Sequence, residues 1–198
     1  MESGVFIAIE GIDGCGKTTQ SKKLVKWLEK KQIKAVYTKE PTDGVIGRIL
    51  KKMVRRENVD PRIEALLFAA DRLEHLKNTV LPLLEKGYVV VSDRYVYSSL
   101  AYQSVTTGDP QWVREINKYA VKPDLAILLD VEPNIGLSRI KRRKTKFEKE
   151  KFLEEVREKY LEMVRNGELK VIDASKNVDE VAEELVRLVG SFLKTTVQ

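Results

Sequence analysis

The stretch Val5–Thr19, VFIAIEGIDGCGKTT, decides the fold, because a short apolar run breaks into glycines there and then opens into a helical pattern. It fits the pattern G-x-x-x-x-G-K-[ST] at Gly11, Gly16, Lys17 and Thr18. Loops of this kind surround a polyphosphate with backbone N–H groups, and glycines stand where a Cβ would block the approach or forbid a positive φ. The helix that follows adds unpaired N–H groups and a favourable dipole. The stretch therefore predicts a site for a nucleoside triphosphate.

The residues of this loop have expected parts in that site. Lys17 would reach the β and γ phosphates, and the hydroxyl of Thr18 would ligate Mg²⁺. An ordinary glycine-rich turn is the alternative, but the motif lies between a predicted strand and a predicted helix, as phosphate binding demands. We expect the triphosphate to contact the whole loop, which comprises Gly11, Ile12, Asp13, Gly14, Cys15, Gly16, Lys17, Thr18 and Thr19.

The composition is that of a globular protein with a basic surface. The chain has 198 residues, of which 42% are hydrophobic and 33% charged, and this predicts one domain over residues 1–198. The net charge of +6 fits either nucleic-acid binding or an enzyme that collects Lys and Arg around anionic substrates. The enzyme is favoured, because no nucleic-acid recognition motif and no basic repeat with interleaved aromatics is present.

The sequence also bears on location. The single cysteine, Cys15, cannot form an internal disulfide, which fits a reducing compartment. A signal peptide and an apolar run of membrane-spanning length are both absent from the sequence. These features predict a cytoplasmic protein. The position of Cys15 in the phosphate loop suggests either a redox switch or a small residue that is merely tolerated there, and the second is favoured.

Strand and helix patterns alternate along the whole chain. Alternation of this kind predicts a three-layer α/β domain with a mostly parallel sheet, probably of five strands, and a right-handed first crossover. The expected strands are Val5–Glu10, Ile33–Thr38, Tyr88–Ser92, Leu125–Asp130 and Leu169–Asp173. The expected helices are Lys17–Lys31, Val45–Arg56, Pro61–Glu85 with a bend near Pro82, Tyr95–Ser104, Pro110–Ala120, one from Pro133 into the basic cluster, Phe147–Arg165 and Val178–Leu193.

A second polar motif narrows the class of enzyme. Asp93 and Arg94 directly follow an apolar strand, at the carboxyl edge where open α/β sheets bind ligands. A carboxylate there can hold Mg²⁺ or orient the attacking oxygen, and an adjacent arginine can clamp a phosphate, whereas a surface ion pair is the alternative. A GTPase is excluded, because the nearest match to its N-K-x-D motif, residues 117–120, lacks the carboxylate.

Five motifs in order resemble the thymidylate kinase family over nearly the whole chain. They are IEGIDGCGKTTQ, KEPTDG, LLFAADR, SDRYVYSSLAYQ and LDVEPNIGLSR. The resemblance implies the fold of the P-loop nucleoside monophosphate kinases and transfer of the γ-phosphoryl group of ATP to dTMP, with Mg²⁺, giving dTDP and ADP for dTTP synthesis. It also implies a homodimer that associates through helix faces.

The resemblance further implies a site for dTMP. Asp13 would face the 3′-hydroxyl of the sugar, and Asp93 would assist Mg²⁺ and the acceptor oxygen. Phe68 would stack on the pyrimidine, and Arg72, one helical turn later, would donate to its O4 carbonyl. The other expected contacts are Arg94 with the phosphate, Pro41 in the pocket wall, Ser98 and Ser99 near the base, Tyr102 against the 2′ position, and Gln103 as a member of the motif.

The basic cluster that follows LDVEPNIGLSR resembles the mobile lid of this family, at approximately residues 139–149. Phosphoryl transfer needs positive charge on the migrating group, and no residue of the phosphate loop other than Lys17 supplies it. A solvated helix face is the alternative. The candidates for this catalytic charge are Arg139, Arg142 and Arg143.

Two segments depart from the family pattern. The common E-P-G-G-T is Glu40-Pro41-Thr42-Asp43-Gly44 here, and the usual D-R-F-E at the end of the lid is Thr145-Lys146-Phe147-Glu148. Two rival functions stay open at this point. One is a kinase for dUMP, another nucleoside monophosphate or a deoxynucleoside, and the other is a nucleotide-gated protein that binds nucleic acid.

Overall fold

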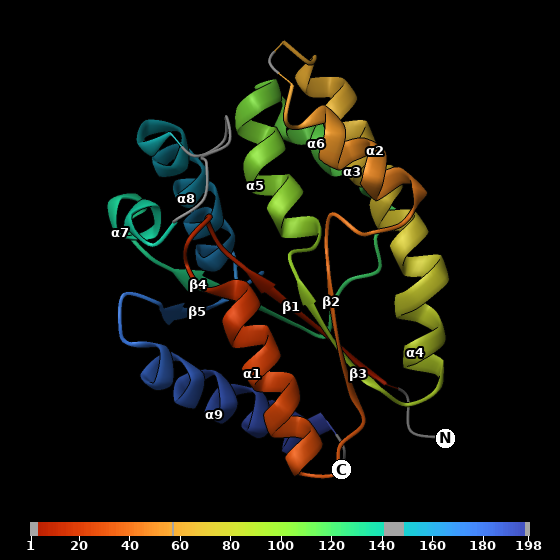
Figure 1. The fold of residues 1–198 in the computed structure, drawn as a ribbon, viewed down its shortest axis with the longest axis vertical. Coiled ribbons are helices and arrows are strands. Elements are labelled where there is room, and N and C mark those ends of the chain that lie inside the picture. The colour runs from red at the N-terminus through yellow and green to blue at the C-terminus, as the bar shows by residue number, and fades with distance from the viewer. Residues whose placement is uncertain (1–3, 57, 141–148, 197–198) are drawn as a thin grey trace.

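The computed structural model describes residues 4–56, 58–140 and 149–196, and its centre is a five-stranded parallel sheet (Figure 1). The strands lie in the order β2-β3-β1-β4-β5. Their bounds are β1 Val5–Glu10, β2 Ala35–Lys39, β3 Val89–Asp93, β4 Leu125–Asp130 and β5 Lys170–Asp173. Every residue of β1 and β3 is buried, as expected of near-continuous apolar strands that helices cover on both faces. The predicted fold class is confirmed.

Helices form the two outer layers. Helices α1 (Lys17–Lys30) and α9 (Val178–Thr196) pack on one another against one face of the sheet, and α5 (Val96–Thr107) contacts both α3 (Pro61–His75) and α8 (Glu150–Arg165) in the other layer (Figure 1). The remaining helices are α2 Val45–Met53, α4 Leu81–Glu85, α6 Pro110–Ile116 and α7 Pro133–Ser138. Within the described ranges, no helix combines the length and the apolar character that a bilayer-spanning segment needs.

The predicted helix Pro61–Glu85 is a composite of three helical segments. A π-helical turn, η1 (Leu76–Val80), separates α3 from α4. Pro82 lacks the N–H that an α-helix would pair with the carbonyl of Asn78, and its ring would clash with that carbonyl. A wider turn directly before Pro82 accommodates this mismatch. In place of the bend predicted near Pro82, the helix changes from α to π type at Leu76, six residues before that proline.

Several predicted helix ends differ from the structure by three residues or more. Helices α5 and α9 end at Thr107 and Thr196 instead of Ser104 and Leu193. Helix α2 ends at Met53 instead of Arg56, and α7 ends at Ser138 before the basic cluster. Helix α6 ends at Ile116 instead of Ala120, because Asn117 leaves the helix and accepts a hydrogen bond from the buried side chain of Arg72. This last contact joins residues 45 positions apart, so local propensity contains no signal for it.

The carboxyl ends of the strands gather the polar residues at one edge of the sheet. The register pairs Ile9 of β1 with Asp93 of β3, and the phosphate loop leaves β1 one residue later. The strand pairing thus sets the Asp93-Arg94 motif beside that loop, where open parallel sheets bind ligands.

Candidate active site

The loop between β1 and α1 has the backbone that phosphate binding requires. Gly14 has φ 82°, and a Cβ there would lie 2.0 Å from the carbonyl oxygen of Gly136. Gly16 has φ 99° and stands at the N-cap of α1, where no side chain of the described residues caps the first turn. The free N–H groups and the dipole of α1 therefore point to an anion as their partner.

Lys17 lies beneath this loop and is buried. Its Nζ donates hydrogen bonds to the carbonyl oxygens of Gly11 at 3.0 Å and Ile12 at 2.8 Å. The ammonium group is therefore held by the main chain of the loop that it serves.

A hydroxyl and a carboxylate meet where α1 begins and β3 ends. Thr18 Oγ1 donates to Asp93 Oδ2 at 2.5 Å, and the Tyr37 hydroxyl donates to the same oxygen at 3.3 Å. Burial, and next the charge of Asp93, raises the pKa of Tyr37 to about 12, so this phenol stays a donor. Hard oxygen donors of this kind suit Mg²⁺, which usually takes one or two protein ligands beside phosphates and water. The residues present thus fit the expected metal.

Arg94 faces the same loop from the other side. Its φ of 71° is left-handed, and its Nη2 lies 2.7 Å from Asp13 Oδ1. Its Nη1 donates to Ser98 Oγ at 3.0 Å, and the guanidinium lies 4.9 Å from the ring centroid of Tyr102. The Tyr102 hydroxyl accepts from the backbone N–H of Asp13 at 3.2 Å. The structure therefore brings together four of the residues predicted from two separate motifs.

A cavity of about 800 Å³ lies between the phosphate loop and the second motif. Lys17, Asp93 and Arg94 all contribute to its wall, so the phosphate loop and the second motif share a single site. The other predicted residues in the wall are Asp13, Gly14, Cys15, Gly16, Thr18, Thr19 and Arg139. Gly11 and Ile12 are buried beneath the loop and do not line this cavity.

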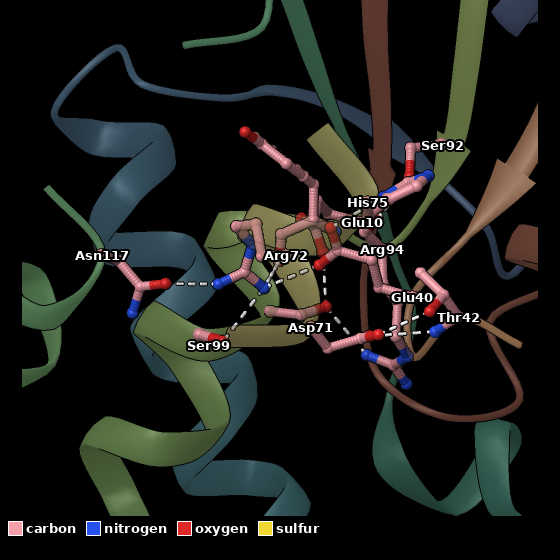
Figure 2. A network of polar contacts seen from close by, with 12 residues as sticks. Glu10, Glu40, Thr42, Asp71, Arg72, His75, Ser92, Arg94, Ser99 and Asn117 are labelled. Carbon is pink, nitrogen blue, oxygen red and sulfur yellow. Dashed lines mark hydrogen bonds and ion pairs between the residues drawn. The ribbon is translucent and has the colours of Figure 1, made fainter. Parts of the chain in front are cut away.

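Arg72 is the centre of a second, buried network next to this cavity (Figure 2). Its Nη2 donates to Glu40 Oε2 at 2.8 Å, Ser99 Oγ at 3.1 Å and the Tyr95 carbonyl at 3.1 Å, while its Nη1 donates to Asn117 Oδ1. Its Nε is buried without a hydrogen-bond partner among the described residues. Glu40 also lines the main cavity, so the two parts of the site are contiguous.

Six of the nine predicted dTMP residues lie on two helices that touch. Phe68 and Arg72 lie on α3, Ser98, Ser99, Tyr102 and Gln103 lie on α5, and these helices contact one another. Phe68 and Pro41 are half-buried, whereas Ser98 and Ser99 are buried. The two serine hydroxyls bind the two arginines, because Ser98 accepts from Arg94 and Ser99 from Arg72.

Sequence patterns missed several members of these networks. Glu40 Oε1 lies 3.0 Å from His75 Nδ1, and Asp71 accepts from both the N–H and the hydroxyl of Thr42. His75 is the only histidine of the chain. Its position one helical turn after Arg72 was the one feature of the sequence that could have indicated its part in the network. Thr42, the family departure, thus anchors the loop after β2 to α3.

Glu10, at the end of β1, is also a missed member. It is fully buried, and burial raises its pKa to about 7, although hydrogen bonding to Ser98 and the charge of Arg94 oppose that rise. Its oxygens accept from the Tyr95 N–H at 2.9 Å and from Ser98 Oγ at 2.6 Å. The pattern VFIAIE gave it no role beyond that of a strand end.

The predicted lid is described only at its first residues and at residue 149. Arg139 donates to the carbonyl oxygens of Ala174 at 2.9 Å and Ser175 at 3.2 Å, at the wall of the cavity. The other two candidates, Arg142 and Arg143, lie outside the described residues, as does the segment Thr145-Lys146-Phe147-Glu148.

A phosphate loop, its lysine and a carboxylate that suits a metal, together at the edge of a parallel sheet, define a P-loop kinase of the α/β class. The chain matches the family described as thymidylate kinase over residues 9–185. It is 44% identical to a "Probable thymidylate kinase" of Thermococcus gammatolerans, covering 94% of this chain and 96% of the relative. Proteins of the same name from Pyrococcus abyssi and Staphylothermus marinus are each 45% identical, covering 94% and 96% of this chain and 96% and 97% of the relatives. The chain belongs to the thymidylate kinase family, and it is therefore an ATP-dependent nucleoside monophosphate kinase.

Proposed function

We propose that this chain transfers the γ-phosphoryl group of ATP to dTMP, giving dTDP and ADP. The observation that carries the proposal is the single cavity whose wall contains Lys17, Asp93 and Arg94. One phosphate-binding loop and one phosphate-clamping arginine on the same cavity suit a donor triphosphate and an acceptor monophosphate held end to end. Membership of the thymidylate kinase family supports dTMP as that acceptor.

On the donor side, ATP would lie along the phosphate loop. The N–H groups of residues 13–18 and Nζ of Lys17 would surround the β and γ phosphates. The same cavity is lined by the apolar side chains of Ile140, Val178 and Val181 and by the guanidinium-bearing Arg139. We propose that these residues contact the adenine, since an apolar wall suits a purine face.

On the acceptor side, dTMP would replace the ion pair between Asp13 and Arg94. These two side chains are partly exposed and lie 2.7 Å apart. A nucleoside monophosphate offers a phosphate to Arg94 and a 3′-hydroxyl to Asp13, so each partner would exchange one hydrogen bond for another. The Tyr102 hydroxyl lies against both, and this supports its proposed contact with the 2′ position of deoxyribose.

For the base, the network of Arg72 supports the proposed contacts. Four acceptors already fix its guanidinium, and the unpartnered Nε–H leaves one buried donor that a carbonyl such as thymine O4 would satisfy. Phe68, one turn earlier on α3, is half-buried and would stack on the pyrimidine. Pro41, Ser98, Ser99 and Gln103 would complete the walls of this pocket.

The transfer itself needs no covalent intermediate. An oxygen of the dTMP phosphate attacks the γ-phosphorus of ATP, and the bond from that phosphorus to the bridging oxygen of ADP breaks. Lys17 stabilises the charge on the transferred group, and Asp93 with Thr18 would hold the metal. A magnesium ion held by Thr18 and Asp93 would supply positive charge that neutralises the phosphates. We propose residues 1–198 as one kinase domain, with residues 139–149 as its lid and Arg139, Arg142 and Arg143 as its candidate catalytic cations.

A panel of acceptors at fixed ATP and Mg²⁺ tests this function. Release of ADP would be followed with dTMP, dUMP, other nucleoside monophosphates and thymidine, and kcat/KM is expected to be highest for dTMP by about tenfold or more. Preference for another acceptor would refute the proposal and favour the rival kinase. If no acceptor were phosphorylated and duplex DNA bound with a steep salt dependence, the protein would be a nucleic-acid binder.

We also propose a homodimer that forms through α3. Ile63, Leu66 and Leu73 are 43 to 50% exposed and share one face of this helix by their spacing. Leu66→Glu is expected to convert the dimer to a monomer in light scattering, whereas Tyr119→Glu, at an exposed apolar residue outside α3, should not. A monomeric wild type would contradict the proposal. The substrates ATP and dTMP support a cytoplasmic location.

A further inference from the structure

Glu10 lies at the end of β1, directly before the phosphate loop, and its side chain points into the second motif. The carboxylate is fully buried, and three donors surround it, two from the start of α5 and one from α8. Oε1 accepts from the backbone N–H of Tyr95 at 2.9 Å, while Oε2 accepts from Ser98 Oγ at 2.6 Å and from the Tyr160 hydroxyl at 3.2 Å. A buried carboxylate with three protein donors is an organised part of the site, yet Glu10 itself does not line the cavity.

Ser98 Oγ, the Tyr160 hydroxyl and Glu10 Oε2 contact one another, because Ser98 Oγ also lies 2.9 Å from the Tyr160 hydroxyl. Ser98 has one hydroxyl proton, and it gives this proton to Glu10. The lone pairs of Ser98 Oγ are then turned toward Arg94, whose Nη1 donates to that oxygen at 3.0 Å. Glu10 therefore sets the direction of the hydroxyl that holds the guanidinium.

Glu10 also holds the backbone on which Arg94 is built. Arg94 has φ 71°, a conformation that costs free energy in a residue with a Cβ. The N–H of Tyr95, the next residue, is the donor to Glu10 Oε1, and the N–H of Arg94 donates to the carbonyl of Ile9 at 3.0 Å. The end of β1 thus fixes this left-handed turn from both sides. Figure 2 shows Glu10 and Arg94 among the residues of this polar network.

We propose that Glu10 is a positioning residue for the acceptor phosphate, which orients Arg94 through the Ser98 hydroxyl and the Tyr95 amide. The inference rests on the proposed role of Arg94 as the clamp of that phosphate. It predicts that loss of the Glu10 carboxylate harms acceptor binding selectively, because the donor phosphates are held by the loop backbone and by Lys17, whose Nζ donates to Gly11 and Ile12 instead.

Steady-state kinetics of Glu10→Gln separate this role from a general structural one. The amide keeps the volume and one acceptor for the Tyr95 N–H, but it turns a donor toward Ser98. The KM for dTMP is expected to rise about tenfold, as the loss of one hydrogen bond to a charged group implies, while the KM for ATP changes less than about twofold. Equal changes in both KM values, or none, would overturn the proposal.

Two further variants complete the test. Ser98→Ala should raise the KM for dTMP in the same way, and the double variant should be no worse than the poorer single variant, because both changes break one chain of hydrogen bonds. Fully additive effects would overturn the route through Ser98. If Glu10→Gln failed to fold, Ser98→Ala would decide, since an unchanged KM for dTMP would contradict the role of its hydroxyl.

Asp130→Asn is the matched control for loss of a carboxylate, and Arg94→Ala separates the role of Glu10 from the acceptor site on which it depends. Asp130→Asn removes a carboxylate at the end of the adjacent strand β4, where it pairs with Arg157 away from Arg94, and it should leave the ratio of the two KM values unchanged. Arg94→Ala tests the premise. If it leaves the KM for dTMP unchanged, the proposed acceptor site is wrong. If it raises that KM and Glu10→Gln does not, only the role of Glu10 is refuted.

Discussion

The ion pair between Glu40 and Arg72 is the buried interaction whose loss should be most costly. Both side chains are 2 to 3% exposed, and Glu40 Oε2 lies 2.8 Å from Arg72 Nη2. The other carboxylate oxygen lies 3.0 Å from His75 Nδ1. Glu40→Gln keeps the shape of the side chain and removes its charge, so the guanidinium of Arg72 would stay buried without a counter-ion. Its remaining partners would all be neutral: the oxygens of Ser99, Asn117 and Tyr95 and the amide oxygen of the new glutamine.

Breaking a buried ion pair from one side costs about 3–5 kcal/mol, because the remaining charge is uncompensated. The glutamine oxygen can still accept one hydrogen bond, so we expect the lower end of that range, about 3 kcal/mol. For a chain of this length, that loss corresponds to a fall in Tm of roughly 6–12 °C. The effect is large because both side chains are almost entirely removed from water.

Urea unfolding followed by circular dichroism measures this loss. The matched control is Asp179→Asn, which breaks the pair between Lys23 and Asp179 at 2.5 Å, where the side chains are 39% and 83% exposed. Water screens that pair, so its loss should cost less than about 1 kcal/mol. If Glu40→Gln cost no more than Asp179→Asn, the assignment of Arg72 as a buried charge that depends on Glu40 would be wrong.

Three further predictions concern the site and its surroundings. Lys17→Ala should lower kcat at least about a hundredfold with an unchanged circular dichroism spectrum, because the charge of Nζ faces the transferred group, and retained turnover would contradict that role. Thr42→Val deletes a hydroxyl that donates to Asp71 at 2.5 Å and should lower the free energy of unfolding by about 1–2 kcal/mol in urea, and an unchanged value would mean that this contact does not anchor the loop. Burial raises the pKa of Glu10 from 4.5 to about 7, so the folded chain binds this proton more tightly than the unfolded chain. The free energy of unfolding should therefore fall by up to about 3 kcal/mol as pH rises from 4.5 to 7, and Glu10→Gln should flatten that part of the curve, so that a curve parallel to the wild type would refute the assignment.

The sequence predicts the sheet best where the physics is local. The predicted bounds of β1 and β4 agree with the structure at both ends, because apolar runs bounded by polar residues are typical of strands buried on two faces. The phosphate loop was predictable for a similar reason, since its glycines and its lysine follow from the needs of one ligand. In both cases the signal is contained within about fifteen consecutive residues.

The helix ends were harder to predict, because the contacts that end them are distant. Asn117 terminates α6, and in the sequence it belonged only to a failed match to a guanine-binding motif. Its function in the fold is to accept a hydrogen bond from Arg72, and a partner so far along the chain leaves no periodic pattern around either residue. The π-helical turn η1 was also hard to predict. Pro82 indicates that the helix is disturbed nearby, but it does not show which residues form the wider turn.

Within the candidate site, the sequence pointed to the arginines more clearly than to the buried glutamates that accompany them. The difference has an electrostatic cause. Arg72 and Arg94 stand in recognisable motifs, since a phosphate or a carbonyl ligand selects for a donor at a fixed place. A buried arginine also needs protein acceptors, and any segment that the fold brings near can supply them. Glu40, directly after β2, accepts from Arg72 at a distance of 32 residues along the chain, whereas Glu10, 84 residues before Arg94, acts on that arginine through the Ser98 hydroxyl. Arg72 and Arg94 therefore depend on carboxylates from distant segments, and only the three-dimensional pairing of strands brings those segments together.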